Sequence, residues 1–229
     1  MKSVETTRNF RVALCAIVGT VLGFGATTAW AGTITGSAHD FSTTGWAGGQ
    51  ICVACHTPHG ANTTVADAPL WNHTVTTKTY VLYSNPATLN ATLSQPTGVS
   101  KLCLSCHDGT VALDSFGGAT GTTFMTGVAA VGAGPADLSN DHPISFTYNT
   151  ALATADGALH DPSTRTVTIG SGTQTRTGTI AATMLYSGTL QCASCHDVHN
   201  TFAVAGAGGD PLLKVSKAGS AICLTCHNK

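Results

Sequence analysis

Charged and aromatic residues are scarce in this chain. Only 9% of the 229 residues are charged and 6% are aromatic, whereas about 25% of the residues of an ordinary soluble domain are charged. The formal net charge is −1 and the sequence has no basic stripe, so a nucleic-acid partner is not expected. Gly, Ala, Thr and Ser dominate, and large apolar side chains are too few for a conventional core. Something other than side chains is therefore expected to fill the interior.

Long apolar runs are also missing, apart from one near the N-terminus. That run extends from Val12 to about Gly25 and is short for a membrane span of roughly 20 apolar residues. A basic start precedes it, and Ala29-Trp30-Ala31 follows it with the small-x-small pattern of a signal cleavage site. Residues 1–31 are predicted to be a secretory signal that is removed, with a retained N-terminal anchor as the alternative. The mature chain, residues 32–229, is expected to be exported and to have no transmembrane span.

The nine cysteines follow one pattern. Cys15 lies in the predicted signal, and the other eight form four C-x-x-C-H strings. The cysteine pairs are Cys52 and Cys55, Cys103 and Cys106, Cys192 and Cys195, and Cys223 and Cys226, and the histidines that follow them are His56, His107, His196 and His227. This string is the attachment signature of c-type haem. Its two thiols reach the two vinyl groups on one porphyrin edge, and its histidine supplies the proximal iron ligand. The sequence therefore predicts four covalently attached haem c groups.

Two other uses of paired cysteines explain the pattern less well. Structural disulfides occur in exported proteins, but a disulfide framework gives no reason for a histidine after every second cysteine. Zinc sites also use C-x-x-C units, but they do not require the trailing histidine four times. Haem attachment accounts for every cysteine of the mature chain and for each histidine that follows a pair.

Histidine is expected to be the second, distal ligand of each iron. The mature chain keeps only two methionines, Met125 and Met184, so methionine cannot fill this position at all four irons. Six histidines lie outside the four strings: His39, His59, His73, His142, His160 and His199. Four of them are needed and two are surplus. The surplus disfavours an open iron, which a catalytic multihaem reductase needs.

An internal repeat helps to choose among the six histidines. Segments 49–59 and 189–199 each contain a C-x-x-C-H string with a further histidine three residues later. In both copies a Pro-Leu segment and a second C-x-x-C-H string follow. The mature chain is therefore predicted to consist of two dihaem units, at about 32–135 and 136–229.

The repeat sorts most of the extra histidines. His59 and His199 occupy matching places, and His39 and His142 each stand upstream of one C-x-x-C-H-x-x-H string. These four are predicted to be the distal ligands, with His73 in reserve. Neither histidine of the matching pair can bind the iron of its own string, because three residues cannot wrap around the porphyrin to its opposite face. Each must serve another haem, which brings two macrocycles close together, as fast electron hopping requires.

The fold is expected to be mostly irregular, with short helical turns at the attachment sites and with the haems forming the core. Residues 165–177 are predicted to form a β-hairpin, because a polar–apolar alternation is followed by a glycine-containing turn at 170–172 and a returning strand. His160, in a loop-like segment, is expected to be a surface residue or a neighbour of a ligand. Asp108 and Asp197 follow proximal histidines, and each is expected either to hydrogen-bond a nearby imidazole or to be a solvated turn residue.

Four stretches of the sequence carry a resemblance to a known family. CVACHTPHGA, APLWNH, SKLCLSCHDGTVALDS and NDHPISFTY resemble the multihaem c-type cytochromes with doubled C-x-x-C-H motifs. The four-site layout is similar to that of the tetrahaem, filament-forming outer-membrane cytochromes of the cytochrome E type, over most of residues 36–229. The resemblance implies a subunit with two histidines on each iron that polymerises outside the cell, its haems stacked in a continuous chain and one distal ligand donated by the adjacent subunit. His39 and His142 match distal-ligand positions of that family.

The sequence therefore predicts an electron carrier and not an enzyme. The favoured form is a head-to-tail homopolymer, an extracellular nanowire at the cell surface, which exchanges electrons with redox cytochromes or extracellular acceptors. His39 near one end of the mature chain and a haem site near the other favour such contacts, which make open filaments when the rotation does not close. A monomeric periplasmic or outer-surface electron shuttle is one alternative, and a multihaem reductase with an open haem is another.

Overall fold

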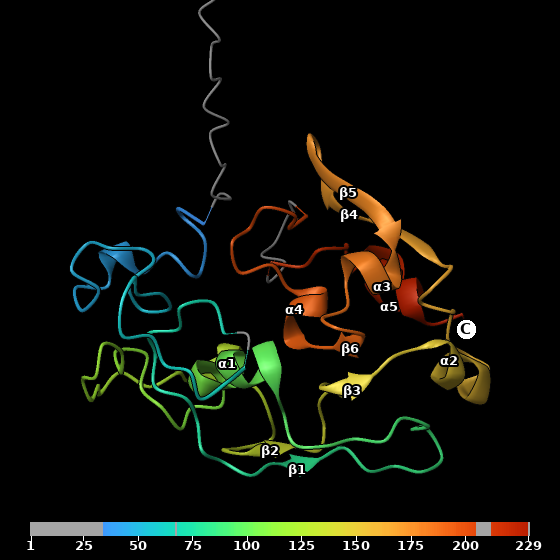
Figure 1. Ribbon diagram of the computed structural model, residues 1–229, viewed down its shortest axis with the longest axis horizontal. Helices are drawn as coiled ribbons and strands as arrows, with labels where there is room; N and C mark the ends of the chain where they lie inside the picture. Colours follow the sequence, from blue (N-terminus) through green and yellow to red (C-terminus); the bar gives the residue numbers. More distant parts are fainter. Residues whose placement is uncertain (1–33, 67, 205–211, 229) are drawn as a thin grey trace, which may run out of the picture. The chain divides into compact units, whose positions relative to one another are not determined.

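A computed structural model describes residues 34–66, 68–204 and 212–228 (Figure 1). Most of this part of the chain has irregular backbone, and its helices and strands are short. All described residues belong to one compact unit. Segment 1–31, predicted to be a secretory signal, lies outside the described residues, and the division of the mature chain into two dihaem units remains a prediction.

The regular elements of the described residues are few. The helices are α1 Gly98–His107, α2 Thr150–Asp156, α3 Ile180–Thr183, α4 Cys192–Cys195 and α5 Ala221–Cys226, with 3-10 turns η1 Phe41–Thr43, η2 Gly127–Ala129 and η3 Ala218–Ser220. The strands are β1 Val81–Leu82, β2 Asp137–Leu138, β3 Phe146–Thr147, β4 Thr166–Ser171, β5 Gln174–Thr179 and β6 Thr189–Leu190. β1 pairs with β2 in parallel, whereas β3 with β6 and β4 with β5 are antiparallel. None of the described helices combines the length and the apolar character that a membrane span requires.

The predicted β-hairpin is present as β4 and β5, with its turn displaced. Ser171 pairs with Gln174, so the chain turns at residues 172–173 and not at 170–172. Gly170 stays in the ladder with a φ of 87°, and a Cβ at this position would lie 2.0 Å from the backbone oxygen of Gln174. Only glycine fits there, so this glycine permits a close backbone approach within the strand and does not form the turn itself.

Apolar side chains gather in three small clusters. The largest draws residues from β3, α2, β4, α3 and β6, and its centre includes Ile169 and Ile180, which are 1% and 0% exposed. A second cluster contains Trp71 and Leu102, and a third contains Leu104. This division agrees with the scarcity of large apolar side chains in the sequence.

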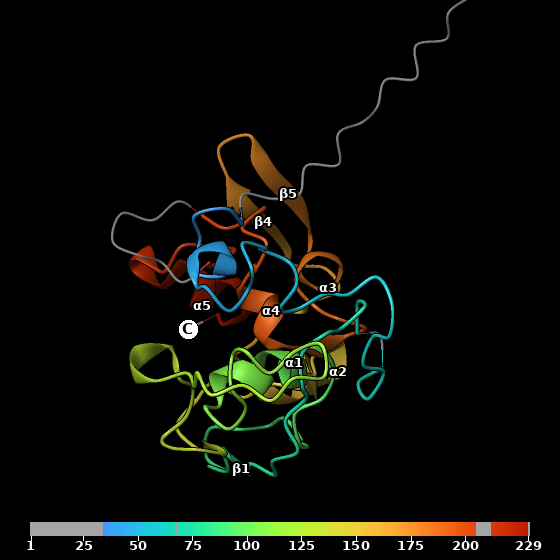
Figure 2. The same cartoon turned by 90° about the vertical axis from the view of Figure 1, so that its left-hand side faces the viewer.

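Buried polar groups join α1 to α4, the helices that carry the second and third C-x-x-C-H strings. The Gln191 side-chain oxygen accepts hydrogen bonds from the Ser100 amide at 3.1 Å and from the Ser145 hydroxyl at 3.2 Å. The Ser100 hydroxyl in turn accepts from the Cys192 amide at 2.9 Å. Ser100, Ser145 and Gln191, here called the α1–α4 bridge, are all buried. Because a buried donor or acceptor is costly to leave unpaired, this bridge fixes α1 beside α4, where both views place them (Figures 1 and 2).

The sequence repeat is reproduced in the backbone. After the first string the Asn72 amide donates to the Cys55 carbonyl at 2.9 Å, and after the third string the Lys214 amide donates to the Cys195 carbonyl at 2.8 Å. The leucine two residues before each of these donors has a left-handed φ, 52° in the first copy and 56° in the second. The same loop therefore returns the chain against the attachment string in both copies.

The α1–α4 bridge can be tested by replacing Gln191 with alanine. This change leaves the Ser100 amide and the Ser145 hydroxyl without their acceptor inside the protein, which should cost about 1–3 kcal/mol of unfolding free energy. Chemical denaturation followed by circular dichroism measures this loss. Gln50→Ala is the control, because Gln50 is exposed, and it should leave the unfolding free energy nearly unchanged. Equal stability of the two variants would show that the bridge does not hold the helices together.

Candidate functional site

Each C-x-x-C-H string forms one helical turn. The second string lies inside α1. In the other three the histidine amide donates to the carbonyl of the first cysteine: His56 to Cys52 at 2.8 Å, His196 to Cys192 at 3.1 Å and His227 to Cys223 at 2.9 Å. Residues at positions i, i+3 and i+4 share one face of a helix. The two cysteines and the histidine of each string therefore point to the same side, as attachment to one porphyrin edge and ligation of its iron require.

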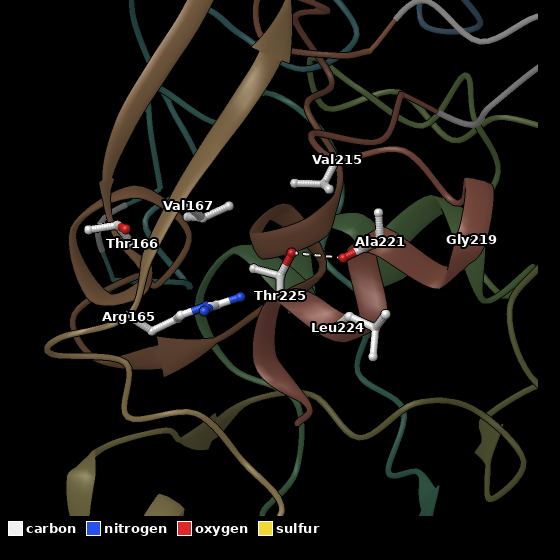
Figure 3. A pocket seen from close by; sticks show the side chains of 8 residues that line it. All are labelled: Arg165, Thr166, Val167, Val215, Gly219, Ala221, Leu224 and Thr225. Atoms are coloured by element: carbon white, nitrogen blue, oxygen red, sulfur yellow. Dashed lines mark hydrogen bonds between the residues drawn. The ribbon is translucent and has the colours of Figure 1, made fainter. Parts of the chain in front are cut away.

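The residue before the second cysteine anchors each turn to the protein. It is small and buried in all four strings: Ala54, Ser105, Ser194 and Thr225 are 2%, 0%, 0% and 7% exposed. Three of them also have a hydroxyl that bonds to the backbone of the same turn, as the Thr225 hydroxyl does to the Ala221 carbonyl at 3.0 Å (Figure 3). A helical turn puts this residue opposite the cysteine–histidine face. One face of each turn is therefore buried in the polypeptide and the other is left for a ligand.

None of the eight described cysteines forms a disulfide. Burial raises the pKa of Cys55 to about 11. The pKa values of Cys106 and Cys226 are raised to about 12, and burial is the largest of several causes. These three thiols are therefore protonated at neutral pH. Among the described residues no three His, Cys, Asp or Glu side chains are grouped to hold a metal ion. A porphyrin iron needs only two residues, because the macrocycle supplies its other ligands.

Cysteines of successive strings are neighbours. For each two successive strings, the charge of a cysteine in one string influences the pKa of a cysteine in the other, or the two cysteines share a hydrogen bond. The neighbours are Cys55 with Cys106, Cys103 with Cys192, and Cys195 with Cys226. Hydrogen bonding between Cys103 and Cys192 raises the pKa of Cys103 and lowers that of Cys192 to about 7. Each attachment site is therefore a neighbour of the next one along the chain, and this succession of sites is here called the attachment row.

Besides His73, three histidines hold their Nδ1 atoms against backbone carbonyls. The Nδ1 atom lies 2.6 Å from the Pro69 oxygen in His56, 2.7 Å from the Ala129 oxygen in His107 and 2.9 Å from the Pro143 oxygen in His142. A carbonyl can only accept, so Nδ1 carries the proton and Nε2 keeps its lone pair. Iron-binding histidines are oriented by this kind of bond on the nitrogen that does not bind the metal.

Histidine rings meet in three places, each time a C-x-x-C-H histidine with one of the predicted distal ligands. The ring centres are 6.0 Å apart for His107 and His39, 6.1 Å for His56 and His199, and 6.4 Å for His227 and His142. An iron with an imidazole on each side separates the ring centres by about 6 Å, since a metal–nitrogen bond is about 2 Å long and the ring centre lies about 1 Å beyond the nitrogen. The three pairs therefore have the spacing that two axial ligands of one iron require.

The His39 ring is suited to bind iron in its neutral form. Burial, followed by the nearness of His107, His196 and His199, lowers its pKa to about 4. The ring is therefore neutral at pH 7, as a metal ligand must be. Its Nδ1 atom is buried and has no hydrogen-bond partner in the described part of the chain. His39 lies opposite His107 of its own chain, and donation of one distal ligand by an adjacent subunit remains a prediction.

The surplus histidines have other surroundings. His73 is 1% exposed, and its two ring nitrogens lie 2.8 Å and 3.0 Å from the carbonyl oxygens of Thr74 and Ala112. Its Nε2 atom lies 3.5 Å from the Cys106 sulfur, so this reserve ligand is beside the second string but bonded to backbone. His160 is held next to the fourth string, where its amide donates to the Cys226 carbonyl at 2.8 Å. His73 and His160 therefore each lie beside an attachment string.

The fourth ligand pair remains a prediction. His59 is exposed, and the sequence predicts only that it serves a haem other than that of its own string. His199, its counterpart in the other copy, lies against His56 of the first string. The reciprocal arrangement would place His59, from the first string, on the iron of the third. Met184 is 2% exposed in the largest apolar cluster, so its side chain is used for packing.

The two aspartates that follow proximal histidines have different roles. Asp197 is a turn residue, and its carboxylate accepts from the backbone amides of His199 at 3.2 Å and Phe202 at 2.6 Å. Asp108 matches neither expectation. It is 3% exposed and accepts hydrogen bonds from the hydroxyls of Thr76, Tyr80 and Thr110. Sequence reasoning missed this buried network, because Tyr80 and Thr76 are far from Asp108 along the chain and no motif marks them.

Exposed apolar side chains lie beside the strings. Each string has at least one exposed apolar residue beside it. The Leu70 carbonyl accepts from the Thr57 amide after the first string, and the Val131 amide donates to the His107 carbonyl of the second. The Tyr186 hydroxyl donates to the Ala193 carbonyl of the third, and Leu224 is part of the fourth. One exposed apolar side chain at each string is ordinary for a protein surface, and Leu224 also lines the pocket at the fourth string.

A shallow pocket adjoins the fourth string on its other side. Arg165 and Val167 of the hairpin segment line it together with Leu224 and Thr225 of α5 (Figure 3). Thr225 belongs to the buried side of the turn, opposite Cys223, Cys226 and His227. This pocket is therefore distinct from the attachment face.

Comparison with known proteins gives no family assignment. No protein-family model matches the chain, and no curated protein matches it significantly. The resemblance to multihaem cytochromes therefore remains an expectation from sequence. The geometry of the strings and of the facing histidines carries the functional argument instead.

The ligand assignments predict how single histidine changes affect iron spin state. His199→Ala removes one member of the His56 pair and should convert one of four irons from low-spin to high-spin, since one axial ligand is lost. His73→Gln, which keeps a hydrogen-bonding side chain, should leave four low-spin irons. Electron paramagnetic resonance of the purified oxidised variants measures both. A high-spin signal from His73→Gln and none from His199→Ala would reverse the assignment and make His73 the ligand.

Proposed function

We propose that this protein transfers electrons through four covalently attached haem c groups, each with a histidine on both faces of its iron. The three pairs of facing histidine rings carry the proposal, because their 6.0–6.4 Å separations are those of two axial ligands. The eight string cysteines would hold the porphyrins through thioether bonds. When bound, the haem supplies one-electron chemistry, with two imidazoles favouring low potentials because no axial methionine raises them.

The polypeptide positions and protects the groups. Backbone carbonyls fix the tautomer and direction of His56, His107 and His142 through Nδ1. Two strong axial ligands leave no open position on the iron, which disfavours substrate binding and the multihaem-reductase alternative. Each helical turn holds its two cysteines and one histidine on one face, so the attachment geometry depends little on the irregular loops around it.

The attachment row supports a path for electrons through the molecule. Cysteines of the first and second, second and third, and third and fourth strings are neighbours. His199, which follows the third string, lies at the ring of His56 in the first. Four haems attached along this row would each lie near at least one other haem. Short distances between neighbouring cofactors are what a multistep electron carrier needs.

The polymeric form is the second part of the proposal. It is supported by the resemblance to filament-forming cytochromes and by the low charge of the chain, 9% of residues, since little charge repulsion opposes association. Donation of one distal ligand by an adjacent subunit, which the resemblance implies, belongs to this part of the proposal. The proposed location is the cell surface or outside it, with electron donors and acceptors that are cytochromes or extracellular acceptors.

Haem content and potential test the first part. The exported mature protein should have the mass of its polypeptide plus four haems, and a reductive titration should show four low-spin irons with negative potentials, because each iron lacks an axial methionine. Mass spectrometry and spectroelectrochemistry measure these properties. The proposal fails if the mass equals that of the bare polypeptide, or if all four potentials are well above zero.

Electron microscopy of the secreted protein tests the second part. Negatively stained native material should contain unbranched filaments built from this chain. As a control, the variant His160→Ala, which alters a histidine outside the predicted ligands, should form the same filaments. Single particles of one chain that still carry four haems would support the monomeric shuttle and contradict the polymer.

A further inference from the structure

The second attachment site has a buried acidic group beside it. Asp108 directly follows His107 and is 3% exposed. Its two carboxylate oxygens accept hydrogen bonds from the Tyr80 hydroxyl at 2.5 Å, the Thr76 hydroxyl at 2.9 Å and the Thr110 amide at 2.7 Å. All these neighbours are uncharged donors. Within the described residues no ion pair with Asp108 is formed, so its charge is solvated by dipoles and is not neutralised.

The field of Asp108 reaches the second string. Thr76 connects the two, because its hydroxyl donates to the Asp108 carboxylate at 2.9 Å and its amide donates to the hydroxyl of Ser105, directly before Cys106, at 3.0 Å. Cys106 is one of the two cysteines that would attach the second haem. The carboxylate is therefore close enough to act electrostatically on a group held there, through an interior in which charges are weakly screened.

The third attachment site has a buried basic group instead. Lys214 is 6% exposed, and its Nζ atom lies 3.4 Å from the Tyr186 hydroxyl and 5.5 Å from the centre of the Tyr186 ring. Its backbone amide is bonded to the Cys195 carbonyl at 2.8 Å. Burial raises the pKa of the Cys195 thiol, and the ammonium group of Lys214 opposes this rise. The Tyr186 hydroxyl in turn donates to the Ala193 carbonyl of the third string at 3.3 Å, so the Lys214 ammonium group lies beside that string, where Asp197 carries the opposite charge.

The other two sites are neutral at the equivalent positions. Asn72 takes the place of Lys214 in the first copy of the repeat, where its amide makes the same bond to the string. Asn228 follows the fourth string as Asp108 follows the second. The two buried charges are therefore departures from the repeat, one at each of the two middle sites.

We propose that Asp108 and Lys214 separate the reduction potentials of the second and third haems, lowering the second and raising the third. This inference rests on the proposed function. Ferric iron carries one more positive charge than ferrous iron, so a nearby fixed anion favours the ferric state and a fixed cation favours the ferrous state. Because the α1–α4 bridge joins the helices that carry these two strings, the two haems would be neighbours. The charges thus favour electron movement from the second site to the third.

Two substitutions taken from the repeat itself test the proposal. Asp108→Asn reproduces the fourth site and should raise one of the four potentials. Lys214→Asn reproduces the first site and should lower one. A buried unit charge about 12 Å from the iron, at an effective dielectric constant of about 20, changes the ferric-to-ferrous ratio by roughly tenfold, which corresponds to a shift of about 59 mV for one electron. Spectroelectrochemical titration of the purified four-haem proteins measures both shifts.

Tyr80→Phe separates the charge from its structural surroundings. It removes a hydrogen bond from the Asp108 carboxylate but keeps the charge, so the affected potential should stay or fall. If Tyr80→Phe raises it as Asp108→Asn does, the effect is structural and the proposal is wrong. Four haems with potentials unchanged in Asp108→Asn and Lys214→Asn would also overturn it while leaving the proposed function intact. Absence of haem from the unmodified protein would instead remove the proposed function.

Discussion

The meeting of two histidine rings across a fixed gap is the constraint on which the proposed architecture depends. Each of the three pairs joins segments far apart in sequence, most clearly His56 of the first string with His199 after the third. The apolar clusters are small and separate, so side-chain packing alone ties the loops together weakly. Under the proposal, iron–imidazole and thioether bonds cross-link these loops, and the porphyrins supply apolar area that the sequence lacks. A chain with little regular structure can then keep one arrangement.

Local features of the site follow from the sequence. The C-x-x-C-H spacing sets a single helical turn with three groups on one face, and a small residue before the second cysteine allows the opposite face to be buried. The repeat predicts matching loops after the first and third strings, and the bonds made by Asn72 and Lys214 match accordingly. The predicted hairpin is also present. Its turn lies further along the chain, since Gly170 is required by close approach of the partner strand and not by the turn.

Long-range pairings were only partly predictable. The repeat argument required His199 to leave its own string, and the structure places it at His56. No pattern in the sequence could assign His39 to His107 or His142 to His227, because the connecting loops are irregular and their length does not fix their path. Buried polar contacts such as the α1–α4 bridge and the Asp108 network depend on side chains from several segments. These contacts make sites that share one motif differ from one another. Under the proposal, such differences favour electron movement along the attachment row in one direction, from the second site to the third.

The central claim is that each iron has imidazole nitrogen on both faces. X-ray absorption spectroscopy of the purified oxidised protein at the iron edge tests it most directly, because nitrogen and sulfur neighbours scatter differently and the coordination number is read from the same data. The account predicts six nitrogen ligands on average at about 2 Å. An average near five, or a sulfur atom bonded to the iron, would contradict it.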